Sequence, residues 1–106
     1  MELVDFQNFV KTQGDAYLPK LKDGCYFLHT PIPLNVPKDG KVHLKLGIKS
    51  QHTVLLIASD IFRPDGAGVI FADREIELNL VNNTGGTVLL EAGDTVIYAH
   101  LIPRDR

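Results

Sequence analysis

Hydrophobic and polar residues alternate with a period of two over much of this chain, and such alternation is typical of half-buried β-strands. In residues 41–50 (KVHLKLGIKS), every second side chain is apolar, while His43, Lys45 and Lys49 face the other way. Residues 74–82 (REIELNLVN) repeat the pattern with acidic residues on the outward face. The inward side chains of these two predicted strands are Val42, Leu44, Leu46, Ile48, Ile76, Leu78 and Leu80.

The segments around these two strands also predict strands and turns. Residues 25–30 (CYFLHT) are aromatic and apolar, and the prolines of residues 31–40 restrict that stretch to a sheet edge or an extended loop. The continuous apolar run of residues 53–59 (TVLLIAS) is typical of a buried strand. Residues 63–68 (RPDGAG) have the composition of a turn.

The two ends of the chain complete the pattern. Residues 82–86 (NNTGG) predict a hairpin, because Asn and Gly tolerate the positive φ that such turns need. Residues 87–103 predict two further strands around a Gly-Asp turn, whereas residues 3–10 are ambiguous between a short helix and a first strand. Many short strands with almost no helix predict an all-β sandwich or barrel, in a single domain over residues 1–106.

Composition and charge narrow the function classes. The chain is 44% hydrophobic and 23% charged, with a formal net charge of −2, so nothing favours nucleic acid or an anionic membrane as a partner. Cys25 is the only cysteine, which excludes an intrachain disulfide and a Cys-rich zinc site. The first ten residues carry Glu2 and Asp5 where a signal peptide has positive charge. We therefore expect a soluble, intracellular protein, in the cytoplasm or nucleus.

Single polar residues suggest little chemistry by themselves. The four histidines are scattered without the paired spacing of metal ligands, so we expect structural or surface roles and no metal: His29, His43, His52 and His100. Asp65 is explained as a turn residue in Pro-Asp-Gly. Arg63 and Arg74 could bind phosphate or be ordinary surface charges. Phe62 and Phe71 flank the turn at 63–68, and belong either to the core or to a pocket or partner-binding patch.

The order of these segments resembles the order found in the dUTPase family. Proteins of that family have the fold of a small jelly-roll-like barrel and work as trimers. The resemblance spans residues 14–103 and rests on "KDGCYFL", "IPLNVPKDGKVHLKLGIK", "GVIFADREIELNLVNNT" and "LEAGDTVIYAHLIP". It implies an all-β, small jelly-roll-like dUTPase-type barrel that forms a homotrimer.

Motifs that carry the family's chemistry are poorly matched. The first, Ala-Gly-x-Asp-Leu, corresponds to "DGCYFL", which keeps Gly24 and lacks the Asp. The second, Pro-Arg-Ser-Gly, falls near residues 59–61, where the Arg and Gly are missing. In the third, Phe71 takes the place of the Asp that orients the attacking water, and no Tyr follows to stack on deoxyribose. A phenyl ring cannot accept a proton from water.

The last two motifs are missing as well. Thr95 and Tyr98 align with the Arg and Gln of the fourth motif, and the Gly-rich fifth motif has no counterpart before Arg106. The aligned positions therefore do not supply the charge that a triphosphate and its metal require. The resemblance implies a catalytically inactive protein without a cofactor, although Asp73 would replace the lost carboxylate if the loop were shifted by two residues.

Within the family, "CYFLHTPIPLNVPKDG" and "GVIFADREIELNLVNN" are similar to the proteins from the first open reading frame of adenovirus early region four. These are degenerate dUTPases that act as adaptors for host signalling and PDZ-domain proteins. The resemblance implies a viral, oligomeric protein-binding adaptor. PDZ binding is not carried over, because it depends on a hydrophobic C-terminal motif and this chain ends in "RDR".

Two sets of residues are candidates for binding. A vestigial pocket or partner-binding site is predicted from Phe62, Arg63, Asp65, Phe71, Asp73 and Arg74. An oligomer interface is predicted on one face of the last strand, from Val96, Tyr98 and His100, because both faces of that strand are largely uncharged. Two other functions stay open: a nucleotide-binding protein or divergent nucleotide hydrolase with a pocket between subunits, and a structural protein that decorates a virion.

Overall fold

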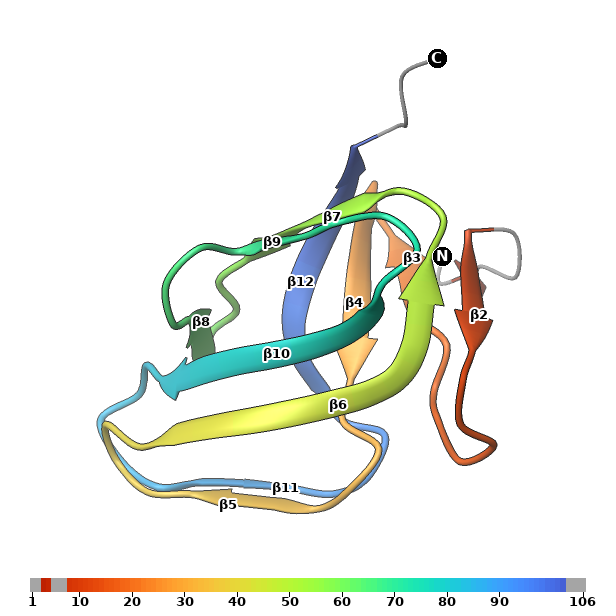
Figure 1. Ribbon diagram of the computed structural model, residues 1–106. Helices are drawn as coiled ribbons and strands as arrows, with labels where there is room; N and C mark the ends of the chain where they lie inside the picture. The colour runs from red at the N-terminus through yellow and green to blue at the C-terminus, as the bar shows by residue number, and fades with distance from the viewer. Residues whose placement is uncertain (1–2, 5–7, 103–106) are drawn as a thin grey trace.

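The structure is a computed structural model that describes residues 3–4 and 8–102, and every regular element within them is a β-strand (Figure 1). All-β architecture, as expected from the alternating sequence, is therefore confirmed. The strands, in chain order, are β1 (Leu3–Val4), β2 (Phe9–Lys11), β3 (Lys20–Lys22), β4 (Cys25–His29), β5 (Leu34–Val36), β6 (Lys41–Ser50), β7 (Thr53–Ile57), β8 (Phe62–Pro64), β9 (Val69–Ile70), β10 (Glu75–Asn82), β11 (Val88–Leu90) and β12 (Thr95–Ile102). Among the described residues, no helix is long and apolar enough to cross a membrane.

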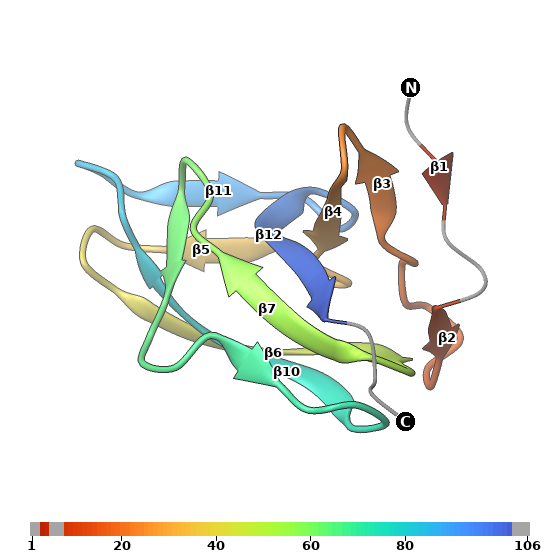
Figure 2. The same cartoon turned by 90° about the horizontal axis from the view of Figure 1, so that it is seen from above.

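The strands pair in three antiparallel sheets (Figures 1 and 2). A six-stranded sheet has the order β1-β3-β4-β12-β7-β9, and a four-stranded sheet has the order β2-β6-β10-β8. The short strands β5 and β11 form a separate two-stranded sheet. This edge position agrees with the prolines on both sides of β5, since proline cannot donate to a ladder.

One hydrophobic core joins the sheets. The inward faces of β6 and β10 match the predicted alternation: Leu44, Leu46, Ile48, Ile76, Leu78 and Leu80 are all buried. The six-stranded sheet contributes Leu28, Ile97 and Ala99 to the same cluster. Phe9 of β2 meets Tyr26 of β4 edge to face, with 5.1 Å between the ring centroids. This contact links one edge strand of the smaller sheet to the centre of the larger sheet.

The beginning of the chain is extended where the structure describes it. β2 pairs with β6, with Phe9 opposite Ser50, and the backbone N–H groups of Thr12 and Gln13 both donate to the Gly47 carbonyl. Because residues 9–11 pair with β6, the described part of this segment is a strand and not a short helix. Phe6, which contributed to the helical reading, lies outside the described residues.

The hairpin predicted at residues 82–86 is wrong. β10 pairs with β6 and β8, whereas β11 pairs with β5, so the segment carries the chain from one sheet to another. Asn82 explains the change of direction: its buried Nδ2 donates to the carbonyls of Val36, Pro37 and Gly86. The bonds to Val36 and Pro37 are long-range, and they compete with the local turn that the neighbours of Asn82 alone would favour.

The strand predicted at residues 53–59 is present as β7, but it is less buried than its continuous apolar run suggests. In β7, Val54 is completely buried, but Leu55 is 38% exposed and Ile57 is half-buried. Only one face of this strand lies on the core.

Candidate functional site

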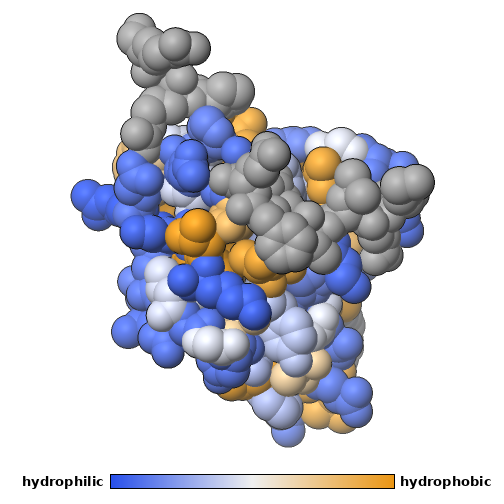
Figure 3. All heavy atoms as spheres, turned by 90° about the vertical axis from the view of Figure 1, so that its right-hand side faces the viewer, coloured by the Kyte–Doolittle hydropathy of each residue, from blue (hydrophilic) through white to orange (hydrophobic). Residues whose placement is uncertain are grey.

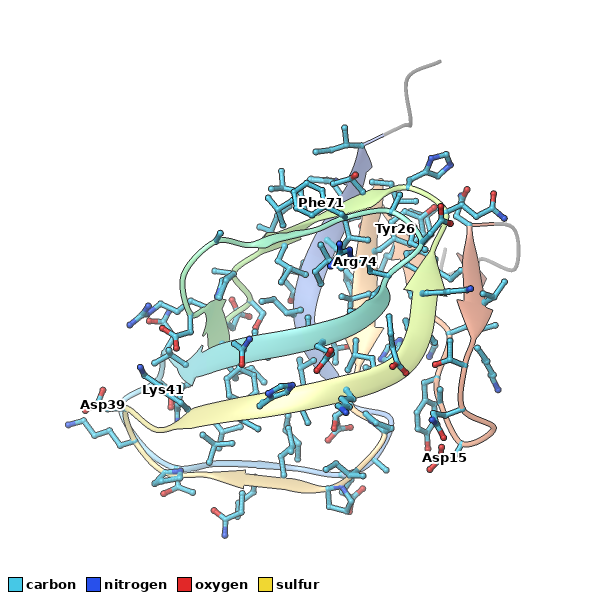
Figure 4. All side chains as sticks on the ribbon, in the orientation of Figure 1. Asp15, Tyr26, Asp39, Lys41, Phe71 and Arg74 are labelled. Carbon is cyan, nitrogen blue, oxygen red and sulfur yellow. The ribbon has the colours of Figure 1, made fainter. Side chains whose placement is uncertain are left out.

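The residues predicted to form one pocket lie at opposite ends of β10. Arg63 is opposite Val81, near the end of β10, whereas Phe71, Asp73 and Arg74 precede its first residue. Each strand residue adds about 3.3 Å, so Arg74 and Val81 are roughly 23 Å apart along the strand. Figure 4 shows the same separation, with Arg74 at one end and Lys41, the neighbour of Asp65, at the other. A single chain therefore does not bring this set together.

Phe62 does not belong to a pocket or a partner-binding surface. It is 0% exposed in β8 and is one of the largest fully buried side chains, so the alternative reading as a core residue is correct. The next side chain, Arg63, points out to solvent because successive residues of a strand face opposite sides. The two neighbours thus have unrelated environments.

The Arg63 end of β10 forms a charged hollow of about 320 Å³. Its charged lining consists of two cations and two carboxylates, namely Lys41, Arg63, Asp39 and Asp65. One cation and one carboxylate already form an ion pair, since Lys41 Nζ lies 3.3 Å from Asp65 Oδ2. Because the positive and negative groups among the described lining residues balance, they supply no excess positive charge for a triphosphate.

At the other end of β10, Phe71 lies on the loop that leads from β9 into β10. Its ring is 65% exposed, and Figure 4 shows it next to β7. Asp73 adopts a left-handed conformation with φ of 65°, and its backbone N–H donates to the Ser50 carbonyl at 2.7 Å. The loop is therefore held against the end of β6 while the aromatic ring stays accessible.

Phe71 continues an apolar surface, which we call the outer face, on the side of the six-stranded sheet that points away from the core. Registered neighbours identify its members, because side chains directly opposite each other lie on the same side of a sheet. Tyr98 is opposite Phe27 and Ile57, Leu55 is opposite His100 and Val69, and Phe71 follows Val69 by two residues. The outer face consists of Cys25, Phe27, Thr53, Leu55, Ile57, Val69, Phe71, Tyr98, His100 and Ile102.

Among the described residues, the members of the outer face include no carboxylate, and β3 places two lysines at its border, Lys20 opposite Phe27 and Lys22 opposite Cys25. Antiparallel sheets with one wet side normally alternate apolar and polar residues. Here the inner side packs on the core while the outer side is also mostly apolar. Such a surface is typical of a binding site for another protein.

Two of the three predicted interface residues lie on the outer face. Tyr98 is half-buried against Phe27, and His100 is exposed. Val96, however, is 0% exposed, so it offers no surface to a partner, and its prediction is wrong. The ladder between β12 and β4 is irregular between Thr95 and Ile97, and this bulge turns both Val96 and Ile97 towards the interior.

Sequence reasoning missed most of the outer face. Phe27, Leu55, Ile57 and Val69 were not singled out, although a signal was present. In residues 53–57, three alternate positions, Thr53, Leu55 and Ile57, contain no charged residue, as expected for a strand with apolar residues on both faces. The absence of charge identifies a strand with two apolar faces, but it does not show which face packs on the core.

Two of the four histidines, His29 and His43, hold local structural positions. His29 is buried, with Nδ1 3.4 Å from Thr95 Oγ1, and His43 Nε2 lies 3.0 Å from Glu77 Oε1 on the exposed side of β6 and β10. Cys25 is half-buried, and its Sγ lies 3.7 Å from the Ala99 carbonyl. In the part of the chain that the structure describes, no group of three or more His, Cys, Asp or Glu side chains could hold a metal ion.

Comparison with known proteins identifies the fold. The sequence matches no model of a protein family and no curated protein. The structure is similar to a mutant dUTPase from phage phi11 of Staphylococcus aureus, with a TM-score of 0.70 and 13% identity over 92% of this chain and 90% of that one. It is equally similar to the dUTPase of Staphylococcus bacteriophage 80alpha, with a TM-score of 0.70, 12% identity and the same coverage. This chain has a dUTPase-like fold.

The dUTPase-like fold expected from the order of the sequence segments is thus confirmed. At 12–13% identity, the similarity concerns the arrangement of strands and not the chemistry of a site. The phi11 study describes the coordination of a structural Mg(II) ion in that enzyme, and the 80alpha study concerns the control of virulence-gene transfer by phage dUTPases. The function of this dUTPase-like chain therefore depends on its own residues and not on the shared fold.

Proposed function

We propose that this chain is a catalytically inactive dUTPase-like protein of viral origin, which forms a homotrimer and acts as an adaptor by binding other proteins. The observation that carries the proposal is the position of Phe71. Where the family resemblance places a catalytic carboxylate, the chain has an aromatic ring that is 65% exposed and continues the outer face. Such a ring cannot act as a general base, but it provides area for a protein contact.

The area of the outer face is comparable with that of functional surface patches but smaller than that of a complete protein–protein interface. The outer face spans five residues each of β7 and β12, and three residues each of β4 and of the segment from Val69 to Phe71. With about 4.8 Å between strands and about 3.4 Å per residue, these stretches cover roughly 260 Å² in projection. This is the size of the functional patch on many monomers, whereas a standard interface buries about 800 Å² per partner. We therefore expect contacts in the assembly to extend beyond the outer face, to the rims that β3 and the Phe71 loop form.

A second candidate function is nucleotide hydrolysis, because the solved structures that share the fold are phage dUTPases. It would require another carboxylate to replace the one missing at Phe71. Asp73 is the nearest candidate, since it is exposed and lies two residues further along the same loop. Its position at one end of β10, far from Arg63, means that any triphosphate site would need residues from another subunit.

Two measurements on the purified chain test the proposal. Sedimentation equilibrium at micromolar concentration should give three times the chain mass of 11.7 kDa. Incubation with dUTP and Mg²⁺ should release no pyrophosphate above the level without protein. A monomer in the first experiment would contradict the trimer, and pyrophosphate release that disappears in Asp73→Asn would establish the second candidate function instead.

A further inference from the structure

One edge of the six-stranded sheet is formed by β9, the last strand in the order β1-β3-β4-β12-β7-β9. Register and one hydrogen bond show which of its backbone groups point away from the sheet. Leu56 N donates to Gly68 O at 2.6 Å, and Ile70 is opposite Val54. In an antiparallel ladder, alternate residues bond to the same neighbour, so Gly68 and Ile70 direct their N–H and C=O groups to β7. Val69, which lies between them, therefore directs its N–H and C=O groups to the free edge.

Phe71 continues this edge. It lies two residues after Val69, and it forms no backbone hydrogen bond to any residue that the structure describes. The side chains of Val69 and Phe71 are exposed, and both belong to the outer face. None of residues 65–75 is buried. Both the outward backbone groups and the apolar side chains of this edge are therefore accessible to another chain.

Contacts at both ends hold this edge in an extended conformation. At the beginning, a Cβ at Gly68 would lie 3.2 Å from the Leu56 carbonyl oxygen, so the glycine lets this segment lie close to β7. After the end, Asp73 N donates to Ser50 O at 2.7 Å, which fixes the following loop to β6. An edge that already has strand geometry loses little ordering free energy when another strand pairs with it.

The two edges of the four-stranded sheet differ from β9. The edge strand β2 carries Lys11, and the edge strand β8 carries Arg63 and Pro64. Natural proteins use charged residues, lysine above all, and proline to prevent another strand from pairing with an edge. Figure 3 views the side of the molecule that β2 forms, where small apolar patches lie among hydrophilic side chains. Residues 68–71 (GVIF) contain no charged residue and no proline, so β9 lacks this protection.

We propose that β9 binds an extended peptide segment of another protein, which adds to the six-stranded sheet as a further antiparallel strand. Antiparallel is the direction of every ladder between the described strands. Peptide residues opposite Val69 and Phe71 exchange backbone hydrogen bonds with them, and their apolar side chains continue the outer face. A second copy of β9 would offer only the same two outward residues, whereas a longer segment also contacts the chain on either side of them. The inference rests on the proposed protein binding and names the class of partner.

Backbone methylation of a probe peptide tests strand addition. The probe is the acetylated and amidated heptapeptide Thr-Val-Thr-Phe-Thr-Val-Thr, titrated into the ¹⁵N-labelled protein. When its apolar side chains continue the outer face, their own N–H groups point to β9 and the N–H groups of the threonines point away. N-methylation of the two valines should therefore weaken binding at least about tenfold relative to N-methylation of the two threonines beside the phenylalanine. The threonine-methylated peptide should also slow hydrogen exchange of the Val69 and Phe71 amides.

The other results of this titration would overturn the inference. Equal affinity of the two methylated peptides would mean that the peptide docks through its side chains alone, which leaves the proposed protein binding in place. The reverse order of affinities would overturn the antiparallel arrangement. Failure of both peptides to bind would overturn β9 as a peptide site, whereas the trimer mass and pyrophosphate release of the proposed function are measured independently.

Two variants at one position separate the backbone of the edge from its side chain. Val69→Pro removes the outward N–H without removing a hydrogen bond to β7, and it should weaken the threonine-methylated peptide at least about tenfold. Val69→Ala keeps the N–H and should leave the affinity within about threefold. An equal loss in both variants would overturn the role of the backbone. Dimerisation that Val69→Pro abolishes, without peptide binding, would identify a second copy of the chain as the occupant instead. The dispersion of each amide spectrum shows that the variant is folded.

Discussion

Phe27 of β4 and Tyr98 of β12 are registered partners whose ring centroids lie 4.8 Å apart, on the side of the six-stranded sheet that faces away from the core. Their sequence neighbours Tyr26 and Ala99 are registered partners as well, and both are buried in the interior. At this point, the sheet has apolar residues on both sides. An aromatic pair of this kind contributes about 0.5–1.5 kcal/mol beyond its buried area, and more of its surface would be covered in an assembly.

Leu55 lies near the centre of the outer face, between His100 and Val69. If the proposed trimer assembles through the outer face, Leu55→Glu should convert it into a monomer, because a carboxylate would be buried without a partner in that interface. Sedimentation velocity at micromolar concentration measures the change. Leu89→Glu is the matched control, since Leu89 is 71% exposed on β11, outside the outer face, and its replacement should leave the assembly intact. Dissociation of both variants alike would contradict an interface at the outer face.

Phe62 and Phe71 provide a direct comparison of a core aromatic with a surface aromatic. Phe62→Ala should lower the free energy of unfolding by about 3–5 kcal/mol, because it leaves a cavity in a closed core. Phe71→Ala should change it by less than about 0.5 kcal/mol. Urea denaturation is carried out with both variants in the Leu55→Glu background, so that loss of assembly does not enter the result. A large loss for Phe71→Ala would place its ring in the core.

Asn82 connects three segments through its side chain. Its Nδ2 donates to three carbonyls at 2.8–3.0 Å, and its Oδ1 accepts from Thr84 N and Thr84 Oγ1 at 2.8 Å. Asn82→Ala should lower the free energy of unfolding by about 2–4 kcal/mol, because buried groups lose their partners. Asn83→Ala, at the exposed neighbouring position, should cost less than about 0.5 kcal/mol. Similar urea midpoints for the two variants would show that the buried amide has no special role.

Position 47 requires a glycine for two reasons: its backbone has a positive φ, and there is no room for a side chain. Its φ is +71°, and an added Cβ would lie 2.8 Å from Gln13 Cβ and 3.0 Å from Ala16 Cβ. Gly47→Ala should therefore destabilise the protein by about 2–3 kcal/mol, as measured by the thermal midpoint and urea denaturation. Gly85→Ala serves as the control, because nothing lies within 4 Å of its added Cβ, and we expect stability to be unchanged or raised by up to about 1 kcal/mol. Tolerance of Gly47→Ala would mean that the β2–β3 connection can move away from β6.

Local alternation predicted the strands well, because Leu44, Leu46 and Ile48 lie on one face wherever the ladder is regular. The prediction failed where an interaction distant in sequence decides the local structure. Asn82 bonds to β5 residues that precede it by more than forty positions, and no turn preference reveals such a partner. At Val96, a bulge shifts the alternation by one residue, and a bulge is not encoded in the pattern of apolar residues.

The candidate site was predicted only in fragments for a related reason. Tyr98 and Phe71 were each singled out, one as an interface residue and one as a pocket residue, but their membership of one surface depends on strand order. β9 joins β7 at the edge of the sheet, and β7 joins β12, so residues from three distant segments share the outer face. Strand order is a property of the whole chain, and alternation within one strand does not determine it.

The pairing of β4 with β12 at the middle of the largest sheet sets the order in which the molecule can be completed. Tyr26 meets Ala99, so these two strands cannot join until β12 and every strand between them in the chain have been synthesised. Until then, β4 and β7 are not yet joined by the strand that lies between them, and their core-facing leucines and valines are open to water or to chaperones. All-β domains dominated by such distant contacts acquire their native structure over milliseconds to seconds, and here β12 is the strand that joins the two halves of the sheet.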